Sequence, residues 1–261
     1  MRLRWSGPAP HTEYSMISSN IAELCLNVGG VAVAAGLTYG GFCYASLWPG
    51  SKLFGSALIA PRRPDEFALT FDDGPNPIWT PHLLDTLAEH GVSATFFMVG
   101  SRVEAEKDLV RRVAAEGHLI GVHSWSHPNL ARCSRARIQE ELVRSKNAIE
   151  QTIGKPVFFL RPPFGARRPA VFSIARSLGL TTVLWNAMTS DWSERSVDKI
   201  VDRQCAKIDR LAHKGWAANV VLHDGGHLDP RIDREPSVTA AGKLVEHYKP
   251  TRRFVTLDTW I

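Results

Sequence analysis

The chain has 261 residues, of which 44% are hydrophobic and 22% charged, and this composition suits one globular domain with some length left over. The formal net charge of +5 would favour an anionic surface, but Lys and Arg are scattered and no nucleic-acid-binding module is present, so we expect no nucleic-acid partner. The four cysteines form no C-x-x-C pair, which argues against a zinc ribbon and leaves the redox compartment open.

The first sixty residues contain an uncharged run. We expect residues 1–20 to be an unstructured leader, residues 21–51 a hydrophobic segment and residues 52–63 a linker. No charged residue occurs from Leu24 to Ser51, which exceeds the roughly 20 residues that a membrane helix needs. Tyr44 and Trp48 near its end suit a membrane interface. This predicts an N-terminal membrane helix, with a cleaved signal peptide and a buried glycine-rich helix as alternatives.

From residue 64 onward, strand patterns alternate with helix patterns. Apolar runs predict seven strands, near Phe67–Phe71, Ala94–Val99, His118–Val122, Val157–Leu160, Thr181–Trp185, Asn219–Leu222 and Arg253–Leu257. Helical spacing predicts helices over 81–91, 103–117, 134–154, 169–178, 197–213 and 238–247, and the first three stop at Gly91, Gly117 and Gly154. The alternation predicts a closed or nearly closed α/β barrel of about seven strands, with an open doubly wound sheet as the alternative.

The polar residues that stand out fall directly after predicted strands. Five separate segments supply them: Asp72 and Asp73, His123, Arg161, Asp191 with Trp192, and His223. In an α/β barrel the carboxyl ends of the strands form one face, where active sites are assembled. We therefore expect these side chains to meet and the protein to be an enzyme.

Two of the histidines have the spacing of metal ligands. His123 and His127 are four residues apart, so on a helical turn both would face the same way. Such a pair is often incidental, an Asp-Asp pair after a strand often only caps a turn, and Arg161 could be a plain ion-pair partner. Together with one carboxylate, however, two imidazoles would hold a metal with open coordination positions, which is the pattern of a catalytic centre. A second carboxylate could then act as base and another histidine as acid.

The motifs TFDDGPNP, HSWSHP, RPPFG, DW and LH occur in the order and rough spacing of the five motifs of NodB-type polysaccharide deacetylases, carbohydrate esterase family 4. The chain resembles this family from about Asp65 to the C-terminus, so residues 64–261 are expected to form a NodB-like deacetylase domain. The resemblance implies a distorted (β/α) barrel. It also implies an enzyme that removes acetyl groups from N-acetylated sugars with a divalent metal, commonly Zn²⁺, with Co²⁺, Ni²⁺ or Mn²⁺ as alternatives.

The resemblance assigns the metal ligands and the proton-transfer groups. It implies that Asp73, His123 and His127 hold the metal. Asp72 matches the family's catalytic base, and His223 matches its general acid.

Five further residues match supporting positions of the family. Arg161 resembles the arginine that orients the base, and Asp191 resembles the carboxylate that orients the acid. Trp192 matches an aromatic wall of the pocket, and Leu222 matches a leucine that lines the acetyl pocket. Phe164 stands where the family commonly has tyrosine, and because the backbone N–H is the group used there, we expect little effect.

One departure concerns the fourth motif. Met188 stands where the family has an aspartate that assists the arginine, so support for Arg161 must come from elsewhere or be absent.

The predicted function is therefore metal-dependent N-deacetylation of a polysaccharide or cell-envelope glycan such as chitin oligomers or peptidoglycan. One alternative is a deacylase that removes a formyl or acetyl group from a lipid-linked amino sugar. Another is a non-catalytic sugar-binding pseudoenzyme. We expect a monomer that is anchored in a membrane with its catalytic domain outside the cytoplasm, with secreted and cytoplasmic locations as alternatives.

Overall fold

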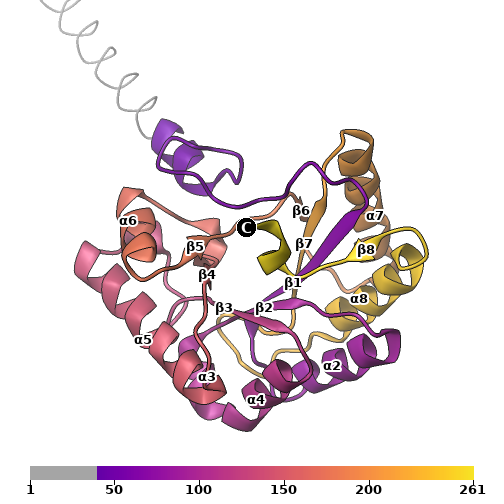
Figure 1. The fold of residues 1–261 in the computed structure, drawn as a ribbon, viewed down its shortest axis with the longest axis horizontal. Helices are drawn as coiled ribbons and strands as arrows, with labels where there is room; N and C mark the ends of the chain where they lie inside the picture. Colours follow the sequence, from indigo (N-terminus) through magenta and orange to yellow (C-terminus); the bar gives the residue numbers. More distant parts are fainter. Residues whose placement is uncertain (1–39) are drawn as a thin grey trace, which may run out of the picture. The chain divides into compact units, whose positions relative to one another are not determined.

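The computed structural model describes residues 40–261, and residues 45–261 form one compact unit. Its sheet has eight strands in the order β5-β4-β3-β2-β1-β7-β6, with β8 paired to β1, and every pairing is parallel (Figure 1). The strands are β1 Glu66–Gly74, β2 Thr95–Met98, β3 Leu119–Val122, β4 Phe159–Leu160, β5 Thr181–Thr182, β6 Ala187–Met188, β7 Ala218–His223 and β8 Arg253–Phe254. The helices are α2 Trp79–His90, α3 Gly100–Ala105, α4 Lys107–Ala115, α5 Arg135–Ile153, α6 Pro169–Ser177, α7 Val197–His213 and α8 Glu235–Tyr248.

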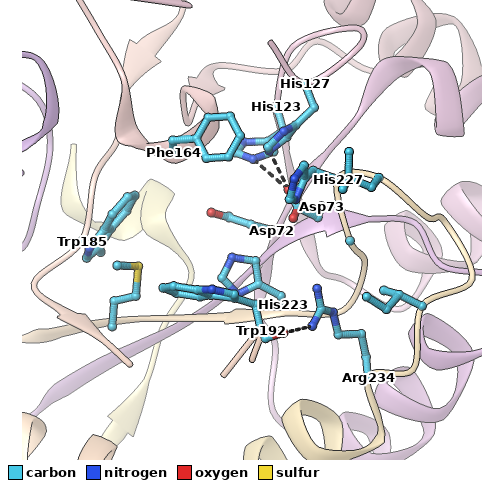
Figure 2. Close-up of a pocket in the computed structure, with 14 residues that line it drawn as sticks. Asp72, Asp73, His123, His127, Phe164, Trp185, Trp192, His223, His227 and Arg234 are labelled. Atoms are coloured by element: carbon cyan, nitrogen blue, oxygen red, sulfur yellow. Dashed lines mark hydrogen bonds and ion pairs between the residues drawn. The ribbon is translucent and has the colours of Figure 1, made fainter. Parts of the chain in front are cut away.

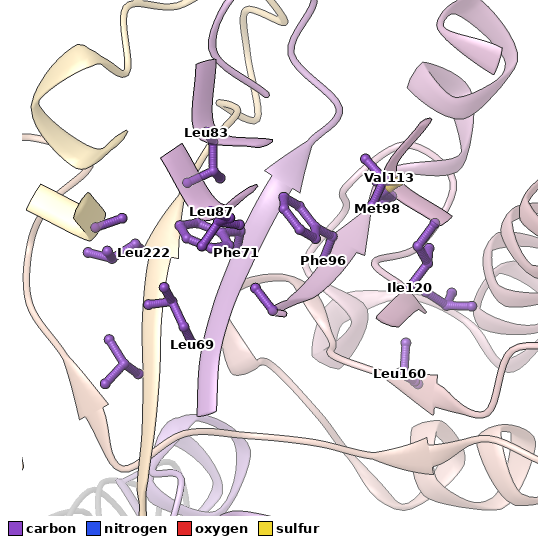
Figure 3. Close-up of a cluster of buried hydrophobic side chains, with 14 of the residues drawn as sticks. Leu69, Phe71, Leu83, Leu87, Phe96, Met98, Val113, Ile120, Leu160 and Leu222 are labelled. Carbon is purple, nitrogen blue, oxygen red and sulfur yellow. The ribbon is translucent and has the colours of Figure 1, made fainter. Parts of the chain in front are cut away.

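Alternation along β1 sorts its side chains between two cores. Phe67, Leu69 and Phe71 join the large apolar cluster between the sheet and the helices (Figure 3). Ala68 belongs to a second cluster, with Phe97, Phe159 and Trp260 among its members. Successive side chains of a strand point to opposite faces, so the intervening residues of β1, Thr70 and Asp72 among them, face the interior of the barrel.

The barrel is incomplete, which confirms the expected distortion. The predicted strand Thr181–Trp185 is only two residues long as β5, and β6 follows as a separate strand that the sequence did not predict. These two edge strands do not pair with each other. Residues 58–61, expected to be part of a linker, instead bond to both sides: Leu58 N donates to Thr182 O (2.8 Å), and Ala217 N donates to Pro61 O (2.9 Å).

The C-terminus fills the end of the barrel opposite the carboxyl ends of the strands. β8 pairs only with Glu66 and Phe67 at the start of β1. The 3₁₀ turn Leu257–Trp260 follows it, and Trp260 Nε1 donates to the buried Glu66 Oε2 at 2.6 Å. Figure 1 shows this end of the chain inside the ring of strands. The opposite end of the barrel is thereby left for a site.

The helix boundaries follow the expected signals in part. Gly91 and Gly154 take left-handed conformations (φ 59° and 67°) and end α2 and α5, as the sequence predicts. The helix expected over 103–117 is instead two helices, α3 and α4, that meet at Glu106.

Most of the expected membrane segment, residues 21–51, precedes residue 40 and lies outside the described residues, as does the expected leader. Between residues 40 and 261 no helix is both long and apolar enough to cross a bilayer. The segment at 46–51 is held by the fully buried Arg167, whose Nη1 donates to Ser46 O (3.1 Å) and whose Nη2 donates to Trp48 O (2.6 Å).

Candidate active site

A bulge at the carboxyl end of β1 allows two adjacent aspartates to face the same cavity. Asp72 pairs with Phe97 of β2, but the next pair is Gly74 with Met98, so Asp73 is the extra residue. Its φ is +70°, a left-handed conformation that re-aims the side chain. Strict alternation would have pointed Asp73 away from Asp72, and the bulge removes that restriction.

Glycine is required where the loop after β7 passes the bulge. A Cβ on Gly225 would lie 1.9 Å from Asp73 O. The Arg102 side chain bridges the two loops by donating to Asp73 O and Gly226 O. The β1 and β7 ends are therefore tied together at the site.

The two predicted ligands His123 and His127 lie in a loop and not on the helical turn that their spacing suggested. His123 directly follows β3, and the chain then takes left-handed conformations at Ser124 (φ 63°) and His127 (φ 59°). The loop is pinned by the buried carboxylate of Glu141 on α5, which accepts from Trp125 N and Ser126 N, both at 2.8 Å. A four-residue spacing fits a helix, but these positive φ values bring the imidazoles together by a different path.

The Asp73, His123 and His127 side chains converge as a donor set. Their ligand atoms lie within 4.8 Å of one another, and all three residues are buried. Asp73 Oδ1 is 3.3 Å from His123 Nε2 and 2.9 Å from His127 Nε2, yet it has no hydrogen-bond partner. Three converging donor atoms without a hydrogen bond between them fit a divalent cation, because a carboxylate and two imidazoles are ligands of such ions and leave coordination positions open.

The electrostatics of this cluster suit metal binding. Burial would raise the pKa of Asp73, but the neighbouring imidazoles hold it well below its usual value. Burial is also the main cause that lowers the pKa of His127. The ligand forms, an ionised carboxylate and a neutral imidazole, are therefore favoured near neutral pH.

Arg161 contacts both His123 and Asp72. Its backbone carbonyl accepts from His123 Nδ1 at 2.7 Å, which fixes the tautomer and leaves Nε2 as the donor atom. Its fully buried guanidinium donates from Nη1 to Asp72 Oδ1 and to Thr70 Oγ1, both at 2.8 Å. Nη2 donates to Asn219 Oδ1 at 3.3 Å.

The structure therefore shows what supports Arg161 where the family aspartate is missing. Met188 lines the cavity, and the Asn219 amide, the Thr70 hydroxyl and the face of the Phe97 ring, 4.1 Å from the guanidinium carbon, surround the arginine. Because Asn219 is neutral, Asp72 is the one carboxylate within ion-pair distance of Arg161 in the described part of the chain.

His223 and Asp191 form a buried pair. His223 Nδ1 donates to Asp191 Oδ1 at 3.0 Å, and His223 N donates to Oδ2 at 2.8 Å. Ser237 Oγ also donates to Oδ2, at 2.9 Å. Burial alone would lower the pKa of His223, but Asp191 and then Asp73 and Asp72 raise it to about 9. His223 is therefore protonated at neutral pH, as a proton donor must be, and the Trp192 ring packs edge-on against it at 5.4 Å between centroids.

A cavity of about 400 Å³ contains most of the predicted site residues (Figure 2). It is lined by Asp72, Asp73, His123, His127, Phe164, Trp185, Met188, Trp192, His223, Gly226, His227, Leu228, Ile232 and Arg234. Arg161 and Asp191 do not line it, but they contact Asp72 and His223 directly. Two residues that line the cavity were not predicted from the sequence, His227 in the loop after β7 and Arg234 at the end of that loop, just before α8. The only sequence signal for them was a run of polar residues.

Leu222, unlike the other predicted site residues, lies on the side of its strand that faces away from the cavity. It is fully buried in the cluster between the sheet and the helices, beside Leu69 and Phe71 (Figure 3). Its neighbour His223 faces the cavity, and alternation along β7 sends Leu222 to the opposite side. The same alternation places Val221 on the side of His223.

The fold and site resemble those of a class of hydrolase: an α/β barrel whose strand ends carry an Asp-His-His donor set, a second carboxylate and a buried histidine. The model of the polysaccharide deacetylase family matches residues 60–183. A peptidoglycan-N-acetylglucosamine deacetylase of Bacillus cereus is 37% identical over 201 residues, which are 76% of this chain and 89% of that protein. A chitooligosaccharide deacetylase of Sinorhizobium fredii is 34% identical over 183 residues, 68% of this chain and 82% of the relative. The chain belongs to the polysaccharide deacetylase family, and it is a hydrolase of carbon–nitrogen bonds.

Solved structures agree with this assignment. The Bc1960 peptidoglycan N-acetylglucosamine deacetylase has a TM-score of 0.68 at 34% identity and covers 78% of this chain and 91% of its own. A mutant of BA3943, described as a CE4 family pseudoenzyme with restored enzymatic activity, has the same TM-score at 25% identity and covers 78% of this chain and 70% of its own. The family therefore includes at least one protein that is named as a pseudoenzyme.

Proposed function

We propose that the protein hydrolyses the N-acetyl group of amino sugars in a polysaccharide or cell-envelope glycan. Asp73, His123 and His127 would hold a divalent metal, for which Zn²⁺ is the first choice. The observation that carries the proposal is that Asp72 and His223 line the same cavity as this donor set (Figure 2). Relatives that are named as peptidoglycan and chitooligosaccharide deacetylases support the substrate class.

In the proposed mechanism Asp72 accepts one proton and His223 donates another. A bound divalent cation supplies Lewis acidity, which polarises the carbonyl and acidifies water. Asp72, oriented by its hydrogen bond from Arg161, takes a proton from the attacking water. The backbone N–H of Phe164 can stabilise the negative charge that develops on the carbonyl oxygen. His223 then donates its proton to the departing nitrogen, so that acetate and a free amino sugar result.

The two proton-transfer groups and the metal ligands give different mutational signatures. Asp72→Asn should lower turnover by about 10²–10⁴-fold while the protein still binds metal, since proton transfer is lost and the ligands remain. Asp73→Ala should lose metal binding and activity together. Loss of metal binding in Asp72→Asn as well as in Asp73→Ala would contradict these roles. Activity that survives exhaustive chelation of the metal would contradict them too.

The substrate is tested by acetate and formate release from the purified protein with added Zn²⁺. The panel should hold N-acetylglucosamine oligomers, peptidoglycan and lipid-linked amino sugars. Release from the first two substrates is the expected result. Release only from the lipid-linked sugar would support the alternative deacylase function, and sugar binding without release would support a pseudoenzyme.

We further propose that the N-terminal segment anchors the protein in a membrane with the catalytic domain outside the cytoplasm. The uncharged run from Leu24 to Ser51 and the envelope glycans that relatives are named for support this location. Membrane fractionation followed by protease treatment of intact cells would test it. Recovery of the protein in the soluble cytoplasmic fraction would contradict it.

A further inference from the structure

The two ligand imidazoles are held in place by different means. His123 donates its Nδ1–H to the carbonyl oxygen of Arg161 at 2.7 Å. His127 Nδ1, in contrast, is buried and has no hydrogen-bond partner among the described residues. A metal-ligating histidine almost always donates its second ring nitrogen to such a partner, which sets the orientation of the ring. Among the described residues, ring contacts and not a hydrogen bond at Nδ1 therefore surround the His127 imidazole.

Besides the imidazole of His123, with ring centroids 5.0 Å apart, two aromatic side chains from other strand ends pack against the His127 ring (Figure 2). Phe164 lies edge-on, with ring centroids 4.7 Å apart and an interplanar angle of 73°. His227 stacks on it at 5.4 Å and 28°. Phe164 and His227 also contact each other, at 5.6 Å and 77°, so the three rings form one cluster.

The two packing partners come from different strand ends. Phe164 follows β4 in a left-handed conformation (φ 59°), and His227 belongs to the loop after β7. Both residues are exposed on the cavity side, Phe164 by 50%. The donor atoms that converge are those of Asp73, His123 and His127, and His227 is not one of that group. Its contact with the site is thus through its ring.

We propose that Phe164 and His227 are positioning residues that orient His127 as a metal ligand by ring packing, in place of the missing hydrogen bond. The proposal rests on the metal-dependent function proposed above. Removal of either ring would let the His127 imidazole turn about its side-chain bonds, and the third donor would no longer be aligned with the other two. The loss is expected first in metal affinity and only as a consequence in activity.

The test measures Zn²⁺ affinity of the full chain by competition with a chromogenic chelator, together with the visible absorption spectrum of the Co²⁺ form. His227→Ala and Phe164→Ala should each weaken Zn²⁺ binding by about tenfold or more, as loss of an outer partner of a ligand does, and should alter the Co²⁺ spectrum. His227→Phe and Phe164→Tyr keep a ring and should restore both readouts to wild type. Trp192→Ala is the matched control, because Trp192 lines the same cavity and packs on His223 instead.

Three outcomes would overturn the proposal. If His227→Phe binds Zn²⁺ as weakly as His227→Ala, then a nitrogen of His227 is itself a ligand. If the alanine variants bind Zn²⁺ like the wild type, ring packing does not orient His127. If Trp192→Ala weakens binding equally, the effect is general to the cavity. Absence of Zn²⁺ binding by the wild-type protein would instead defeat the proposed metal-dependent function, so the two failures are distinguishable. Because both rings are exposed, thermal unfolding of the metal-free variants should match the wild type.

Discussion

Replacement of Asp191 by asparagine tests the electrostatics of the proton donor. The carboxylate of Asp191 accepts two hydrogen bonds from His223 and is the largest of the influences that raise the pKa of that histidine. Asparagine keeps the size of the side chain but removes the charge. Burial of His223, which acts in the opposite direction, remains in the variant.

The size of the effect follows from the two pKa values. The pKa of His223 is about 9, against 6.5 for an unperturbed histidine. Without Asp191 the pKa should return to about 7 or below, because burial then opposes only the more distant carboxylates. At pH 9 half of the wild-type histidine is protonated, but at a pKa of about 7 only about 1% is, so kcat/KM of the variant at pH 9 should be about 50-fold below that of the wild type.

The assay is kcat/KM against pH from 6 to 10 for the wild type, Asp191→Asn and a control, with metal content measured at each pH. On the alkaline limb of the pH profile, kcat/KM of the wild type should fall to half its maximum near pH 9, and that of Asp191→Asn about two pH units lower. The control is Ser237→Ala, which removes one hydrogen bond to Asp191 and keeps its charge, so its limb should move by less than about half a unit. An unchanged limb in Asp191→Asn would refute the assignment of His223 as the acid tuned by Asp191.

Three further substitutions test buried charged side chains. Glu141→Ala removes a buried carboxylate that pins the histidine loop, so the free energy of unfolding in urea should fall by about 2–4 kcal/mol and metal affinity should fall with it; an unchanged affinity would mean that the loop holds its shape alone. Arg167→Lys cannot span the carbonyls of Ser46 and Trp48, and a loss of about 2–4 kcal/mol in the same measurement, with faster proteolysis within residues 46–51, is expected. Equal proteolysis rates would show that this contact does not hold the segment. The pKa of the buried Asp224 is raised to about 6 by burial, so the folded state binds its proton more tightly and the free energy of unfolding should fall by about 2 kcal/mol between pH 4 and pH 7. Asp224→Asn should remove that part of the pH dependence, and an identical pH profile of the two proteins would contradict it.

The order of the elements and the position of the site were predictable because they depend on local patterns. Strand and helix periods in the sequence located β1 to β4, β7 and most helices, and parallel strands require that their carboxyl ends share one edge. The residues that follow those ends, such as Asp72, His123 and His223, could therefore be assigned to one face from the sequence. The predicted strands at β5 and β8 were also located but are shorter than expected, whereas β6 was missed because its two residues leave almost no period to read.

The contacts between segments that are distant in the sequence could not be predicted. No local rule relates Asn219 to Arg161, or Glu141 to the loop of His127, because each pair meets only when the barrel closes. Leu222 shows the same limit: its neighbour His223 was correctly placed, but the side of the strand on which each residue lies depends on register with β1 and not on the motif.

The sequence by itself determined the chemistry that the protein can carry: an Asp-Asp pair, two closely spaced histidines, and a third histidine with an aspartate, each after a strand. Only the tertiary structure decided how these groups are oriented. The bulge at Asp73 turns the second aspartate toward the cavity, Arg161 ties the base to one ligand histidine, and the rings of Phe164 and His227 pack on the other. The physical reason is that residue types are local properties of the chain, whereas the angle at which a side chain meets its partner is set by the packing of every strand end around it.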